Sequence, residues 1–179
     1  MINALEVSGN VIFTYSGKVN TAGLIRTGNI TQQWAPDSEI IPFVGQIYFG
    51  NANAESYTWT SSPSTFWSSL GAGGSTKTIV RSGPMFGING GEIFLQDTYS
   101  SNDSIAGSMT FALASFSSLG LSAGTYTATL PNDTVTMNIG PVPTPAPLPI
   151  LGLPAAFLST RKLRKRIKAS REVASTSLD

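Results

Sequence analysis

Apolar and polar residues alternate with a period of two along much of residues 1–140. In residues 7–16 this alternation places Val11, Phe13 and Tyr15 on one face of an extended strand. Glycine, asparagine, aspartate and proline separate such runs from one another. Further runs lie at residues 47–49, 57–60, 76–81, 92–95, 108–114, 125–130 and 134–139. The pattern predicts an all-β domain over residues 1–140, an antiparallel β-sandwich of jelly-roll or immunoglobulin-like type.

The clearest predicted hairpin covers residues 125–140. Pro131, Asn132 and Asp133 suit its turn, because proline presets φ and the two polar residues tolerate left-handed backbone. Threonine occupies most of the intervening positions and is expected on the opposite face. The apolar rows of the two arms are Tyr126, Ala128 and Leu130, and Val135, Met137 and Ile139.

Two local features refine this prediction. Tyr126 follows Gly124 in an arrangement that resembles a tyrosine corner, in which the hydroxyl ties a loop to a sandwich edge. A plain core aromatic is the alternative for this side chain. No long amphipathic helix is predicted before residue 140, although residues 64–70 suit one or two helical turns.

The chain changes character after residue 140. Prolines at positions 141, 143, 145 and 147 predict an extended spacer over residues 141–147. An apolar run and a basic cluster follow within residues 148–168, and residues 169–179 are expected to form a disordered tail. The apolar side chains are Leu148, Ile150, Leu151, Leu153, Phe157 and Leu158, and the basic ones are Arg161, Lys162, Arg164, Lys165, Arg166 and Lys168.

Residues 148–168 predict a short hydrophobic and basic helix that is held in a membrane only transiently. The apolar part, residues 148–158, would span about 17 Å as a helix, against about 30 Å of hydrocarbon. Pro154 also lies inside it, where proline interrupts a helix. A helix that lies on a membrane or on the domain itself is one alternative, and a basic cluster that binds nucleic acid is another.

Charge and composition exclude several classes of function. Residues 1–140 carry four Lys or Arg against eight Asp or Glu, hence −4, whereas residues 141–179 carry seven against two, hence +5. An acidic domain with a basic tail is not typical of a nucleic-acid-binding domain, so no nucleic-acid partner is expected. The chain has no cysteine and no histidine, which removes disulfides, thiol nucleophiles and the Ser-His-Asp triad. We expect no metal and no cofactor.

The order of spacer, apolar run and basic cluster resembles the PEP-CTERM protein-sorting signal, and most closely its cyanobacterial proline-threonine-proline-alanine variant. Val142, Pro143, Thr144, Pro145 and Ala146 occupy the sorting motif, with threonine where the wider family has glutamate. The resemblance implies export, recognition by an exosortase-type membrane transpeptidase and removal of the tail. It also implies transient residence in the inner membrane, followed by delivery to the cell surface or extracellular matrix. We expect a non-enzymatic protein.

A looser resemblance covers the body of the chain. Residues 118–126 and 134–140 are similar to the end of many all-β domains that precede this signal, and residues 41–45 and 82–88 look like strands of the same domains. The first residues, 1–6, have neither the basic nor the apolar region of a signal peptide. An exported chain should have one, so either the true start lies upstream of Met1 or the signal peptide has been removed.

Two other functions stay open at this point. A surface carbohydrate-binding module would use exposed aromatic rings, for which Trp67, Trp59 and Trp34 are the candidates, and an extracellular polysaccharide would then be a partner. Trp67 is the foremost of these, because its neighbour Phe66 competes for the inward face of a strand. A secreted glycoside hydrolase would instead use a carboxylate pair. Its candidates are Glu39, Glu55, Glu92 and Asp97, and their spacing pairs no two of them.

Two oxygen-rich segments are candidate calcium sites. Asn51, Asn53 and Glu55 alternate as calcium ligands can, but the glycine and the distal glutamate of an EF-hand are absent. Residues 97–103 hold a second acidic loop. Turns are the favoured interpretation of both segments.

Overall fold

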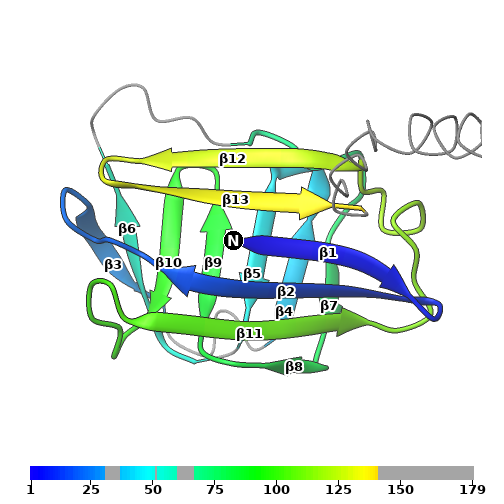
Figure 1. Ribbon diagram of the computed structural model, residues 1–179, viewed down its shortest axis with the longest axis horizontal. Coiled ribbons are helices and arrows are strands. Elements are labelled where there is room, and N and C mark those ends of the chain that lie inside the picture. Colours follow the sequence, from blue (N-terminus) through cyan, green and yellow to red (C-terminus); the bar gives the residue numbers. More distant parts are fainter. Residues whose placement is uncertain (31–36, 51, 60–66, 141–179) are drawn as a thin grey trace, which may run out of the picture. The chain divides into compact units, whose positions relative to one another are not determined.

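The computed structural model describes residues 1–30, 37–50, 52–59 and 67–140, and these residues form an all-β fold of two sheets (Figure 1). The six-stranded sheet has the order β12-β13-β1-β2-β11-β8, with β1 at Ile2–Val7, β2 at Asn10–Lys18, β8 at Arg81–Ser82, β11 at Ser104–Phe111, β12 at Gly124–Leu130 and β13 at Asp133–Ile139. The fold class predicted from the alternation is therefore confirmed at the level of an all-β domain.

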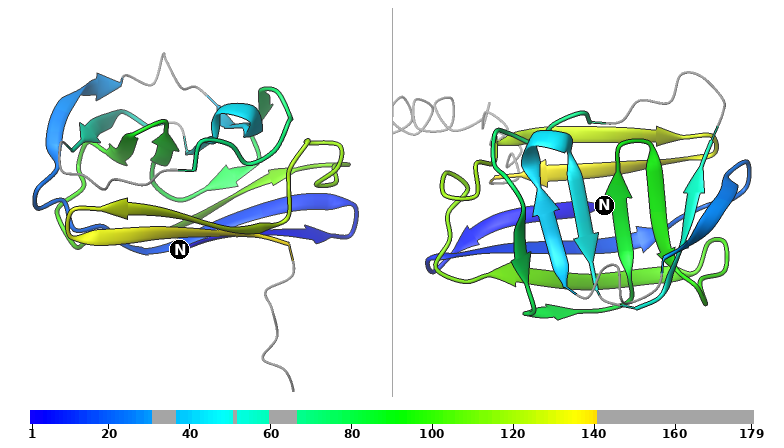
Figure 2. Two further views of the ribbon diagram at one scale, coloured as in Figure 1. Left: turned by 90° about the horizontal axis from the view of Figure 1, so that it is seen from above. Right: turned by 180° about the vertical axis from the view of Figure 1, so that it is seen from behind.

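The seven-stranded sheet forms the second layer, as the left view of Figure 2 shows. Its order is β3-β6-β10-β9-β5-β4-β7, with β3 at Ile25–Ile30, β4 at Ser38–Ile41, β5 at Gln46–Phe49, β6 at Ala54–Thr58, β7 at Thr76–Thr78, β9 at Phe86–Asn89 and β10 at Glu92–Gln96. A 3-10 turn at Pro42–Val44 separates β4 from β5. Strands of one layer run across those of the other in Figure 1, so inward side chains of both sheets meet in one core.

Aromatic side chains join the two layers. The Tyr15 ring of β2 lies 4.7 Å from the Phe49 ring and 5.3 Å from the Phe86 ring, both in the seven-stranded sheet. Gly107 is directly opposite Tyr15 on β11, and a Cβ there would lie 2.6 Å from the tyrosine hydroxyl. The ring therefore occupies the space that the absent side chain leaves, and glycine at this position is a packing requirement.

The first strand, β1, lies in the interior of the six-stranded sheet, between β13 and β2. β1 pairs antiparallel with β2 and parallel with β13, so strands from the two ends of the domain lie side by side. Ile2 and Ala4 are fully buried, whereas Leu5 is 40% exposed, which matches the alternation of a half-buried strand. Sequence reasoning did not predict this strand, because its pattern is too short to distinguish from a loop.

The predicted hairpin is confirmed. β12 and β13 pair with Leu130 opposite Asp133, which leaves Pro131 and Asn132 as the turn. Most of its predicted inward side chains are buried, and Tyr126 is partly buried against the core. The Tyr126 hydroxyl also donates a hydrogen bond to the Ser122 carbonyl at 2.8 Å, so the side chain packs on the core and ties its own loop.

Replacing Tyr126 with phenylalanine is expected to lower the free energy of unfolding by about 1 kcal/mol, the usual net contribution of one hydrogen bond. The ring and its core contacts remain, so the loss reports the hydroxyl alone. Urea unfolding measures it, with Thr127→Ala on the solvent face as the control. A Tyr126→Phe protein as stable as the parent would show that the bond to Ser122 contributes nothing.

Several predicted boundaries were wrong. The run at residues 76–81 is not one strand: it breaks into β7 and β8, which belong to different sheets. The strand predicted at residues 108–114 is shifted to Ser104–Phe111, and Leu113 has a positive φ of 53°. Strands β3 and β4 were missed. The described part of the predicted helical turn, residues 67–70, is irregular, and the stretch 42–44 turns rather than extends.

Candidate functional site

The tryptophans proposed to stack on sugars are buried, and that prediction is wrong for both that are described. Trp67 is 5% exposed, and its ring N–H donates a hydrogen bond to the Gly45 carbonyl at 2.7 Å. Trp59 is 8% exposed and also belongs to the core. Burial of a large aromatic surface stabilises the domain more than an exposed ring would, and Gly45 satisfies the Trp67 N–H. Trp34 lies outside the described residues.

The predicted sorting elements also lie outside the described residues. These are the motif at residues 142–146, the apolar run at 148–158, the basic cluster at 161–168 and the tail at 169–179. Within residues 1–30, 37–50, 52–59 and 67–140, the structure has no helix long and apolar enough to cross a membrane.

The outer face of the seven-stranded sheet carries the most varied side chains. Ile47 and Phe49 of β5 face the core, so Tyr48 between them faces outward. A single cross-strand row follows from the pairing registers of all seven strands. The row is Lys77, Glu39, Tyr48, Gly87, Phe94, Ser56 and Gly28.

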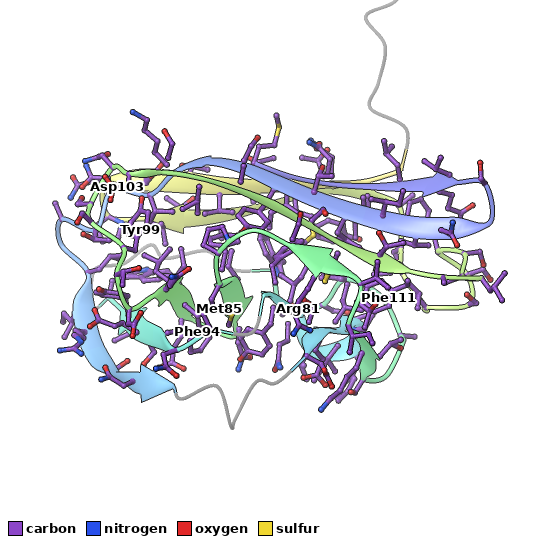
Figure 3. The ribbon with its side chains drawn as sticks, turned by 90° about the horizontal axis from the view of Figure 1, so that it is seen from below. Arg81, Met85, Phe94, Tyr99, Asp103 and Phe111 are labelled. Atoms are coloured by element: carbon purple, nitrogen blue, oxygen red, sulfur yellow. The ribbon has the colours of Figure 1, made fainter. Side chains whose placement is uncertain are left out.

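Tyr48 is half-buried and held in place by its neighbours in this row. A Cβ on Gly87, directly opposite, would lie 2.3 Å from the Cδ1 of the Tyr48 ring, so the ring leans over the glycine. Beyond Gly87 the ring meets Phe94, with centroids 5.1 Å apart and planes at 70°. Phe94 and Met85 (Figure 3) form a small apolar cluster with Ala54, which is separate from the main core. The Tyr48 ring packs against this cluster.

Polar groups surround the Tyr48 hydroxyl. Burial raises the pKa of Tyr48 to about 12, a hydrogen bond with the Asn89 side chain opposes that shift, and the charges of Glu92 and Glu39 add to it. The phenol is therefore protonated at neutral pH. Glu92 accepts a hydrogen bond from the Thr27 hydroxyl at 3.2 Å, and Glu39 accepts one from the Ser75 hydroxyl. We call Tyr48, Asn89, Glu92 and Glu39 the Tyr48 patch.

The candidate carboxylates of a hydrolase are not brought together. Glu39 on β4 and Glu92 on β10 are separated by β5 and β9, which places their backbones about 14 Å apart at about 4.8 Å per strand. Glycosidase carboxyls lie about 5–9.5 Å apart. Glu55 on β6 stands opposite Leu95, three residues from Glu92, so it points to the other face, where it forms an ion pair with Arg26 at 2.7 Å. Asp97 lies beyond the end of β10.

Side chains of the oxygen-rich loops accept hydrogen bonds from backbone N–H groups. Asp103 accepts a hydrogen bond from the Ser100 N–H at 3.2 Å, and Asp133 accepts one from the Asn20 N–H at 2.9 Å. The Tyr99 hydroxyl, near Asp103 in Figure 3, accepts a hydrogen bond from the Val19 N–H at 2.7 Å. The described residues contain no group of three or more acidic side chains that could hold a metal ion. Glu55 lies in a strand, not in a loop, and Asn51 is outside the described residues.

An open groove of about 420 Å³ lies beside β7, at one edge of the seven-stranded sheet. Phe111 and Leu119 line its apolar side, and Asp37 and Lys77 line its polar side. The Arg81 guanidinium of β8 lies 3.9 Å from the Asp37 carboxylate, so this pair joins the two sheets next to the groove. The charged side chains of Asp37 and Lys77 lie on the rim of the groove.

The outer face of the six-stranded sheet is mostly polar, although Leu5 and Val7 of β1 are exposed on it. Among its outward strand positions Lys18 carries the only charge, and hydroxyl and amide side chains dominate. Some of these side chains bond one another: Thr125 donates to Asn138 at 2.9 Å, and Asn138 donates to Asn3 at 3.2 Å. The cross-strand row is Thr125, Asn138, Asn3, Thr14, Ser108 and Ser82.

The chain thus has, in its described residues, two all-β layers, one with a mostly polar outer face and one with an outer face that carries an aromatic patch. No protein-family model matches it, and neither a curated protein nor a solved structure matches it.

Sequence reasoning missed Tyr48, although a signal for it was present. Ile47, Tyr48 and Phe49 are consecutive, and a strand sends only alternate residues to one face. If Ile47 and Phe49 both point into the core, Tyr48 between them must point outward. Tyrosine is also the residue of the three that best tolerates water. The prediction of a sugar-stacking ring named the tryptophans instead, because their rings are larger.

Proposed function

We propose that this protein is an exported, non-enzymatic component of the cell surface or extracellular matrix, which an exosortase-type transpeptidase processes at its C-terminal sorting signal. The observation that carries the proposal is the division of the chain at residue 140. A body of net charge −4 precedes a proline spacer, a short apolar run and a basic cluster within a segment of net charge +5. Removal of that segment would leave an acidic all-β domain.

The faces of the domain support a structural or binding role. One outer face consists mostly of hydroxyl and amide groups and carries a single charge, on Lys18, which suits a hydrated surface and a matrix setting. The four candidate carboxylates of a hydrolase are dispersed over separate strands, faces and loops. We further propose that the two layers constitute a β-sandwich of jelly-roll or immunoglobulin-like type, followed by a short helix over residues 148–168.

The sorting proposal predicts a processed, surface-located protein. The full chain with its upstream coding region is expressed in cells that contain an exosortase-type enzyme, and each cell fraction is analysed by intact mass. We expect a surface or extracellular product that lacks the basic cluster. Simultaneous Pro143→Ala, Thr144→Ala and Pro145→Ala substitutions should retain the full-length chain in the membrane, because the enzyme would no longer recognise the motif.

Thr176→Ala, which changes the tail beyond the basic cluster, is the control and should be processed like the parent. A full-length parent chain in the cytosol would contradict the proposal. So would a triple variant that is processed as efficiently as the parent.

A further inference from the structure

The Tyr48 patch combines a fixed aromatic ring with hydrogen-bonding groups on both sides. Its members lie on four neighbouring strands in the order β4, β5, β9 and β10, so sheet geometry sets their positions and no loop has to close. The ring lies over the Gly87 backbone and contacts Phe94 on the next strand. A ligand that binds there meets a preorganised surface, and little conformational entropy is lost on binding.

The chemistry of the patch selects a hydroxyl-rich ligand. Carboxylate and amide oxygens of Glu39, Glu92 and Asn89 accept hydrogen bonds from hydroxyl groups, and the Asn89 amide and Tyr48 hydroxyl donate them. The face of an aromatic ring is electron-rich and attracts polarised C–H groups such as those of a sugar ring. Neighbouring strands are about 4.8 Å apart, which is close to the length of one pyranose unit.

The negative charge of the domain favours a neutral polysaccharide over an anionic one. The body carries −4 in total, and two members of the patch are carboxylates. An anionic polysaccharide would be repelled, whereas a neutral one would not. We propose that the outer face of the seven-stranded sheet binds a neutral polysaccharide that runs across the strands, with one pyranose ring against Tyr48 and the hydroxyls of that ring and its neighbouring units bonded to Asn89, Glu92 and Glu39. This site goes beyond the sorting signal and does not depend on it.

The proposal is tested with the purified full chain and four neutral hexasaccharides: cellohexaose, xylohexaose, chitohexaose and maltohexaose. Isotope-labelled protein is titrated by NMR, and affinities are measured by calorimetry. We expect at least one hexasaccharide to shift the backbone amide signals of Gly87, Asn89 and Glu92 while those of the opposite face, such as Thr127, stay constant.

Variants distinguish loss of the Tyr48 ring contact from loss of the fold. Tyr48→Ala should weaken binding by about tenfold or more, and Glu92→Gln by about 3–10-fold, the range expected for one hydrogen bond. Gly87→Ala should also weaken binding, because its Cβ would displace the Tyr48 ring while the side chains of Asn89, Glu92 and Glu39 are left unchanged. Gly28→Ala in the same cross-strand row is the matched control, since its nearest neighbour, the Ser56 hydroxyl oxygen, would lie at an ordinary 3.6 Å.

Thermal unfolding of each variant establishes that it is folded. Absence of binding to all four hexasaccharides at millimolar concentration would overturn the proposal, as would amide shifts confined to another face. Equal affinities for Gly87→Ala and Gly28→Ala would overturn the role of the ring even if Tyr48→Ala does not fold. Binding of tetramethylammonium in place of the sugars would assign the patch to cations instead. The purified chain needs no export, so none of these results bears on the sorting proposal.

Discussion

Replacing Phe13 with alanine is expected to lower the free energy of unfolding by about 3–5 kcal/mol, the range for a fully buried phenylalanine. Phe13 lies in the middle of β2 and has no exposed surface. Its ring meets Phe111 on the neighbouring strand edge to face, with centroids 6.0 Å apart. The substitution removes that contact and leaves a cavity at the centre of the six-stranded sheet. Urea unfolding followed by tryptophan fluorescence measures the loss, since Trp59 and Trp67 belong to the same core.

Thr14→Ala is the matched control for this substitution. Thr14 is the next residue on the same strand and is exposed, so its replacement should change stability by no more than about 0.5 kcal/mol. Comparable losses for the two variants would show that β2 does not have one buried and one solvent face. The assigned register of the six-stranded sheet would then be wrong.

Replacing Ala4 with aspartate is expected to leave the domain largely unfolded. Ala4 is fully buried on β1, opposite Phe13 of β2 and Ile139 of β13. A carboxylate there would have no polar partner, and an unpaired buried charge costs more than about 4 kcal/mol, a large part of the stability of a domain. The strand also joins the β12–β13 hairpin to β2, so its loss would divide the six-stranded sheet. Circular dichroism and NMR dispersion report the outcome.

Leu5→Asp tests the same strand on its other face. Leu5 is 40% exposed, so its carboxylate would reach water and the domain should remain folded with a loss of about 1 kcal/mol. A folded Ala4→Asp protein together with an unfolded Leu5→Asp protein would mean that β1 is shifted by one residue, because such a slip exchanges the two faces.

Elements whose partners lie nearby in the chain could be predicted from sequence. The β12–β13 hairpin needs only its own alternation and the Pro131-Asn132 turn, and both strands were placed within one residue. Elements that depend on distant partners could not. β1 is a strand because β13 and β2 flank it, and nothing within residues 2–7 indicates a parallel partner at the far end of the domain. Likewise, Thr78 and Arg81 look like one strand but pair with different sheets.

The sequence by itself determined the all-β class that the described residues before position 141 adopt, because period-two alternation and turn residues are local properties of the chain. It also set the charge division at residue 140 and the absence of thiol and imidazole chemistry. Only the tertiary structure decided that Trp59 and Trp67 are enclosed in the core. Trp67 is enclosed because Gly45 accepts its N–H and the core surrounds its ring, whereas Tyr48 lies outward because its two neighbours are drawn into the core. Burial depends on what the rest of the chain places opposite a residue, and that information is not local.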